Sequence, residues 1–158
     1  MASKGEQAPD FTAPLANGEL GGFTLSDHLA DEAPIVLAFF PGAFTSTCQH
    51  EMNTFQSRLS ELEDSGATIY GISIDTPFAL NEFREQLGLE FGLISDTNRA
   101  LVNEYGVNID SPDLGIDDLA NRAVFVIDSN QEITYAWIAD DPTNEPDYDA
   151  VIAAATDA

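Results

Sequence analysis

Residues 35–55 read IVLAFFPGAFTSTCQHEMNTF, and this stretch does most to decide the fold. The six apolar residues 35–40 favour a buried β-strand. A helix is predicted next, because apolar residues recur every three or four positions over about residues 47–62, at Met52, Phe55, Leu59 and Leu62. Cys48, the single cysteine of the chain, therefore lies where a buried strand ends and a helix begins.

A thiol at the start of a helix lies beside free backbone N–H groups and the positive end of the helix dipole. Both favour the thiolate, which is the reactive form of cysteine. A lone cysteine is otherwise most often a small buried apolar residue. The strand–helix junction, with a proline and a threonine just before it, makes Cys48 a candidate nucleophile.

The order of apolar segments predicts an α/β fold, with a central mixed sheet flanked by helices. Strands are expected near residues 11–15, 23–25, 35–40, 68–74, 91–94, 122–128 and 133–139. Helices are expected near residues 47–62, 77–87, 97–105 and 148–155, the second with Phe78, Phe83 and Leu87 on its apolar face. Residues 107–121 suggest a long polar loop, and residues 1–8 a flexible tail. One domain is expected over residues 1–158, because no linker divides the chain.

The charge is strongly acidic, with 28 Asp and Glu against 5 Lys and Arg and a net charge of −23. Nucleic acid is excluded as a ligand, because phosphate backbones require clustered Lys and Arg. The regular apolar segments indicate a folded chain rather than disorder. An acidic coat on a folded chain favours a salt-rich cell interior, where screening weakens the repulsion. The alternative is an acidic protein of an ordinary cytoplasm.

The sequence also predicts the cellular compartment of the protein, and it predicts no membrane partner, metal or cofactor. No segment approaches the roughly 20 apolar residues of a membrane span, so no membrane partner is expected. The N-terminus lacks the apolar core of a secretion signal. One cysteine cannot form an internal disulfide, which fits a reducing compartment, and we expect a cytoplasmic protein. No metal-ligand cluster stands out, and neither a metal nor a cofactor is expected.

The motif Pro-x-x-x-Thr-x-x-Cys, here Pro41, Thr45 and Cys48, resembles the active-site loop of the peroxiredoxins, the thiol peroxidases. The resemblance implies a thioredoxin fold with an extra N-terminal strand segment. It implies that the Cys48 thiolate attacks a hydroperoxide and becomes a sulfenic acid. It also assigns Thr45 to holding the peroxide, and Pro41 to shielding the thiolate. The alternative for Thr45 is a loop threonine that bonds its own backbone, and the motif argues against it.

A more acidic thiol cannot by itself make a fast peroxidase. A thiol whose pKa falls from about 8.5 to about 6 gains about thirtyfold in thiolate at pH 7 but loses about ten- to twentyfold in nucleophilicity. Fixed hydrogen-bond donors must therefore stabilise the departing oxygen. Thr45 is one predicted donor. Arg122 is the cationic one, because Arg-x-x-Phe-Val-Ile-Asp resembles the family's arginine-bearing strand; an ordinary surface ion pair is the alternative.

Two further residues are candidates for tuning the thiol. Glu51, one turn after Cys48, matches an acidic residue common in the family. Its carboxylate would disfavour the thiolate unless Arg122 offsets it, and stabilising the first helical turn is an equally good explanation of its presence. His50 has no clear family counterpart. It is expected to be exposed, with tuning of Cys48 as the alternative.

The chain lacks a second, resolving cysteine, so an external thiol or a redoxin protein must reduce the sulfenic acid. Phe-Thr-x-x-Cys-Gln-x-Glu resembles the one-cysteine alkyl hydroperoxide reductase E type, with the Q type as the other candidate. The predicted function is reduction of hydrogen peroxide and organic hydroperoxides. A redox sensor or a chaperone-like protein on the same fold is the alternative. A homodimer or larger homo-oligomer is expected.

Overall fold

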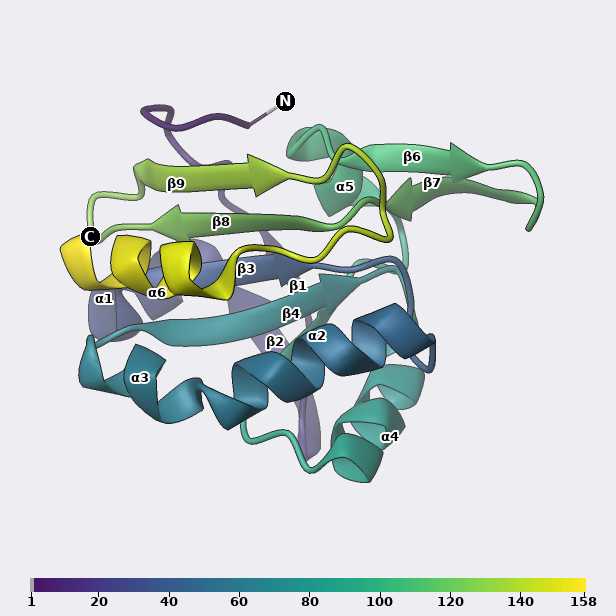
Figure 1. Cartoon of the computed structure of the whole chain (residues 1–158), viewed down its shortest axis with the longest axis horizontal. Helices are drawn as coiled ribbons and strands as arrows, with labels where there is room; N and C mark the ends of the chain where they lie inside the picture. The colour runs from purple at the N-terminus through teal and green to yellow at the C-terminus, as the bar shows by residue number, and fades with distance from the viewer. Residues whose placement is uncertain (1) are drawn as a thin grey trace.

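The computed structural model describes residues 2–158, which form a sheet covered by helices on both faces (Figure 1). Among these residues the strands are β1 (Thr12–Asn17), β2 (Glu19–Thr24), β3 (Ile35–Phe39), β4 (Thr68–Ser73), β5 (Leu93–Ser95), β6 (Asn108–Ser111), β7 (Ile116–Ala120), β8 (Ala123–Ile127) and β9 (Ile133–Ile138). The helices are α1 (Leu25–Glu32), α2 (Ser46–Ser57), α3 (Leu59–Asp64), α4 (Pro77–Leu87), α5 (Ala100–Glu104) and α6 (Tyr148–Asp157).

The described strands form one mixed sheet in the order β2-β1-β5-β4-β3-β8-β9 and a separate hairpin, β6–β7. In its interior, β3 pairs in parallel with β4 and antiparallel with β8. All five residues of β3 and all five of β8 are buried, as expected for strands covered on both faces. The predicted α/β class and the mixed sheet are confirmed, and β1 and β2 supply the N-terminal strand extension at one edge.

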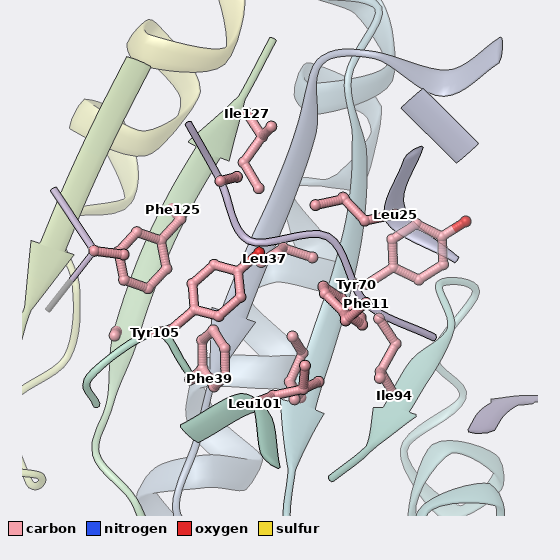
Figure 2. Close-up of a cluster of buried hydrophobic side chains, with 14 of the residues drawn as sticks. Phe11, Leu25, Leu37, Phe39, Tyr70, Ile94, Leu101, Tyr105, Phe125 and Ile127 are labelled. Atoms are coloured by element: carbon pink, nitrogen blue, oxygen red, sulfur yellow. The ribbon is translucent and has the colours of Figure 1, made fainter. Parts of the chain in front are cut away.

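The alternation of side chains along β3 divides the core into two layers. Leu37 and Phe39 point to the layer under α1 and α5, where Phe39 packs on Tyr105 and Phe125 with ring centroids 5.5 and 5.9 Å apart (Figure 2). Val36 points to the opposite layer, which is built from the buried faces of α2, α4 and α6. Cys48 belongs to this second layer, so the helix that carries it is anchored by core packing.

The N-terminal segment differs from the predicted flexible tail. Ala2 and Ala8 are buried, and Ala2 N–H donates to Tyr105 O at 2.9 Å. Gly5 N–H donates to Ile133 O at 2.8 Å, so the described residues 2–8 lie along β9. Small residues and backbone hydrogen bonds hold this segment, and neither produces the apolar periodicity on which the prediction relied.

Two helix predictions also need correction. The helix expected over 47–62 is interrupted at Arg58, whose φ of −108° and ψ of 12° separate α2 from α3. The apolar spacing continues through the break, since Leu59 and Leu62 are still buried, and so it does not reveal the interruption. In α4, Phe78 is 71% exposed and Leu80 is buried in its place.

The predicted loop over residues 107–121 is instead the β6–β7 hairpin. Ile109 pairs with Leu119, and Ser111 pairs with Ile116 after a register shift. The prediction was wrong because the four aspartates of this segment masked the alternation of the apolar residues between them. Figure 1 shows the hairpin extending beyond the main sheet, at the end where α2 begins.

Candidate active site

The turn between β3 and α2 places Cys48 in the first helical turn. Thr45 is the N-cap residue of α2, with an extended φ of −90° and ψ of 148°. Phe44 adopts a left-handed φ of 68°, which non-glycine residues rarely do, so the chain reverses sharply here. Cys48 is 1% exposed, packs in the core and lines a cleft. The predicted position at a strand–helix junction is confirmed.

The Arg122 guanidinium lies directly beside the thiol. Its Nη2 donates to Cys48 Sγ at 3.4 Å, and its Nη1 donates to Glu51 Oε1 at 2.6 Å. Its Nε donates to the carbonyl oxygen of Pro142 at 2.9 Å. The residue is 1% exposed, and it is the only one of the five basic residues, all of them within the described chain, that is buried. Arg122 is therefore a buried cation held in a fixed orientation, and not the surface ion pair that was the alternative.

Glu51 is the buried partner of this cation. The residue is fully buried, and its Oε2 is the one buried side-chain polar atom without a hydrogen bond among residues 2–158. Burial raises the pKa of Glu51 to about 7, although the charge of Arg122 and its hydrogen bond act to lower it. Burial acts to lower the pKa of Arg122, but the neighbouring Glu51 and Cys48 raise it, so the guanidinium stays charged. Glu51 therefore binds Arg122, and it lies beyond the first turn of α2, which contains no acidic residue to stabilise it.

Thr45 is exposed at the edge of the cleft, and its Oγ1 donates to Gly42 O at 2.9 Å. A hydroxyl carries one hydrogen, and here that hydrogen is used within the loop. Towards the cleft Thr45 presents only lone pairs, so in this arrangement it is a hydrogen-bond acceptor where the sequence suggested a donor. Arg122 Nη2 has a second hydrogen and is the donor nearest to the sulfur.

The cleft has a volume of about 290 Å³ and brings together the four residues predicted as catalytic, Pro41, Thr45, Cys48 and Arg122. His50 lies apart from them. It is exposed, and its Nδ1 is 2.6 Å from Glu145 Oε1, which also accepts a hydrogen bond from Tyr148 at 2.6 Å. The expectation that His50 is a surface residue agrees with the structure, which gives it no contact with Cys48.

Sequence analysis missed two groups of residues around the cleft. One is the loop before α6, which contributes the Pro142 carbonyl and Thr143. Every residue has a backbone carbonyl, so a sequence pattern cannot single out the one that binds Arg122. The other is the β6–β7 hairpin, which contributes Ile109, Leu114 and Leu119. Their alternation with aspartates was the available signal.

Among residues 2–158 no group of three or more His, Cys, Asp or Glu side chains is placed to hold a metal ion. In the same part of the chain no helix is long and apolar enough to cross a membrane. The site offers a buried thiol, a fixed guanidinium and a hydroxyl acceptor, which together suit nucleophilic attack with stabilisation of developing negative charge.

Comparisons with known proteins agree with this chemistry. Residues 4–136 match the model of the AhpC/TSA family. The thiol peroxidase of Leptospira interrogans is 35% identical over 160 residues, covering 98% of this chain and 88% of its own length. The chloroplastic 2-cysteine peroxiredoxin of Chattonella marina is 33% identical over 142 residues, covering 85% of this chain and 69% of its own length. The crystal structure of peroxidoxin BcpB from Mycobacterium tuberculosis superposes with a TM-score of 0.82 at 27% identity, covering 96% of this chain and 94% of that one.

Proposed function

Because this chain belongs to the AhpC/TSA family and is a peroxiredoxin, a thiol-dependent peroxidase, we propose that Cys48 is its peroxidatic nucleophile. The Cys48 thiolate attacks the terminal oxygen of a hydroperoxide ROOH. The O–O bond breaks, the new S–O bond makes a sulfenic acid, and the leaving RO⁻ takes a proton to become water or an alcohol. Sulfur is oxidised by two electrons and the peroxide is reduced by two.

The observation that carries this proposal is the contact between Arg122 Nη2 and Cys48 Sγ at 3.4 Å. One hydrogen of Nη2 stabilises the thiolate. The other is free to point into the cleft, where charge builds on the departing oxygen. The bond from Nη1 to Glu51 and the bond from Nε to Pro142 fix the orientation of the guanidinium before the peroxide arrives. No reorganisation is then needed in the transition state, which is the condition under which such donors are most effective.

Thr45 and Pro41 complete the proposed site. With its hydrogen donated to Gly42, the Thr45 hydroxyl accepts the O–H of the hydroperoxide and turns its terminal oxygen towards the sulfur. Pro41 lines the cleft and has no backbone N–H, so it offers no donor that would hold water beside the thiolate. Glu51 acts through Arg122 and is a positioning residue.

Regeneration follows from the absence of a second cysteine in the sequence. The sulfenic acid condenses with an external thiol to a mixed disulfide and water, and a second thiol releases Cys48. We assign the chain to the one-cysteine class and place it in a reducing compartment, the cytoplasm. We also propose that it acts as one domain and assembles with copies of itself. The exposed Phe44 and Phe78, at 47% and 71%, support that assembly as the apolar residues available for it.

The test is stopped-flow measurement of peroxide consumption by the wild-type protein and by Cys48→Ser, with a small-molecule dithiol as reductant. We expect many turnovers for the wild type and none for the variant, with unchanged circular dichroism. Activity in Cys48→Ser would overturn the assignment. A single stoichiometric oxidation without further turnover would instead favour a redox sensor.

A further inference from the structure

Residues 140–146, a loop between β9 and α6, supply the most constant of the three partners of the Arg122 guanidinium. Cys48 changes between thiolate and sulfenic acid in each cycle. Glu51 is buried with one carboxylate oxygen unbonded, and its pKa of about 7 lets it change protonation near neutral pH. The Pro142 carbonyl accepts from Arg122 Nε at 2.9 Å and changes neither its charge nor its hydrogen-bonding capacity. The orientation of the guanidinium therefore depends on where this loop lies.

The loop has two hydrogen-bonded attachments to segments other than α6, within the part of the chain that the structure describes. One is the bond that Pro142 accepts from Arg122 itself. The other is made by Glu145, whose Oε1 lies 2.6 Å from His50 Nδ1 of α2. Next to it, Pro146 is buried and extends the same anchor. Because Arg122 cannot be oriented by a loop that it alone holds, the contact at Glu145 is what makes the Pro142 carbonyl a fixed point.

Glu145 is an anion that binds two donors through one oxygen. Its Oε1 also accepts from the Tyr148 hydroxyl at 2.6 Å. Burial acts to raise the pKa of Glu145, but the hydrogen bonds from Tyr148 and His50 lower it below its usual value. A carboxylate can only accept, so His50 Nδ1 carries the hydrogen of this contact. An exposed ion pair alone contributes little, whereas two charge-assisted bonds that meet at one oxygen fix its position.

We propose that Glu145 is a positioning residue for the reaction with peroxide. Bound to His50 on α2, it holds the loop in place. The Pro142 carbonyl then keeps the Arg122 guanidinium directed at Cys48. The inference rests on the proposed function of Cys48. Glu145 does not line the cleft, so its loss leaves the thiol in place but releases the donor that stabilises the departing oxygen.

The test measures two reactions of Cys48 in the wild type, Glu145→Ala, His50→Ala and Glu145→Gln. One is oxidation by hydrogen peroxide, followed by stopped flow. The other is alkylation by iodoacetamide, in which the sulfur forms an S–C bond and iodide leaves. Both reactions need the thiolate, but iodide needs no hydrogen-bond donor in order to leave. The ratio of the two second-order rate constants therefore reports the donor and not the amount of thiolate.

Glu32→Ala is the matched control. Glu32 also pairs with a histidine, since its Oε2 lies 3.9 Å from His28 Nε2, and its Oε1 accepts from the hydroxyl of a tyrosine, Tyr70. The side chains of Glu32 and Glu145 are 30% and 32% exposed. Glu32 ends α1, which packs on the core layer that does not contain Cys48, so its loss should not reach the site.

We expect Glu145→Ala to lower the ratio of peroxide to iodoacetamide rate constants about tenfold, since a displacement of about 1 Å can cost about 10²-fold. His50→Ala removes the same contact from an exposed position and should lower the ratio in the same way. Glu145→Gln keeps an oxygen for both donors, and its ratio should stay within about threefold of the wild-type value. Glu32→Ala should keep the wild-type ratio.

An unchanged ratio in Glu145→Ala and His50→Ala, or an equal fall in Glu32→Ala, would overturn the positioning role. A fall in Glu145→Gln as large as in Glu145→Ala would assign the effect to the lost charge and would overturn that role as well. Failure of the wild-type protein to react with peroxide, while it still reacts with iodoacetamide, would instead refute the proposed function itself.

Discussion

Replacing Glu51 by glutamine should remove a large part of the pH dependence of stability. The pKa of Glu51 is raised from 4.5 to about 7 in the folded protein, chiefly by burial. The folded state therefore holds this proton more tightly than the unfolded chain does. The resulting stability is fully present below about pH 4.5 and is lost as the pH rises through 7. A pKa of about 7 in place of 4.5 corresponds to about 3 kcal/mol between pH 4.5 and pH 8.

The assay is urea unfolding of the wild type and of Glu51→Gln from pH 4.5 to pH 8, at constant high salt. Glutamine keeps the size of the side chain and an oxygen for Arg122 but cannot titrate. The stability of Glu51→Gln relative to the wild type should therefore rise by about 3 kcal/mol across this range. Glu63→Gln, at an exposed position of α3, removes the same formal charge and serves as the control. Parallel pH curves for the wild type and Glu51→Gln, or an equal effect of Glu63→Gln, would refute the reasoning.

Three further outcomes are expected. Arg122→Lys keeps a charge but loses the fork that reaches both Cys48 and Glu51, so stopped flow should show peroxide reduction slowed by about 10²- to 10³-fold; a wild-type rate would contradict the donor role. Without an external thiol, mass spectrometry should find Cys48 as sulfenic acid, and excess peroxide should convert it to sulfinic acid; a Cys48–Cys48 disulfide as the main product would be evidence against this. The melting temperature should climb with potassium chloride up to and beyond 1 M, because the Debye length falls to about 3 Å there; a flat curve between 0.1 and 2 M would refute salt adaptation.

The centre of the fold could be predicted because its signals are local and strong. A continuous apolar run such as 35–40 and the spacing around Phe55 describe elements buried by many neighbours, and both are present in the structure. The pairing of Cys48 with Arg122, 74 residues later, could not be derived from periodicity. It was predicted from the resemblance of two short motifs, and the geometry supports it.

The residues around the cleft could not be predicted from the sequence, for a different reason. Pro142 contributes a carbonyl oxygen, which every residue possesses, so its role depends only on where the chain passes. Thr45 was predicted to donate to the peroxide, whereas its hydroxyl donates to the Gly42 carbonyl within the loop, a partner that the motif does not reveal. The β6–β7 hairpin was hidden by its aspartates. In each case the deciding partner is set by tertiary structure and not by residue type.

The Arg122–Glu51 pair joins the stability of this protein to its chemistry. Removing a carboxylate from water costs more than its single bond to Arg122 returns, as the raised pKa of Glu51 shows. At neutral pH this burial destabilises the folded state. In return the guanidinium of Arg122 is already oriented, with its three nitrogens donating to Cys48, Glu51 and Pro142. Those three partners come from α2 and from the loop before α6, so the guanidinium is fixed by two segments that are remote from it in sequence. Loosening either segment should therefore slow the reaction with peroxide even where Cys48 itself is untouched.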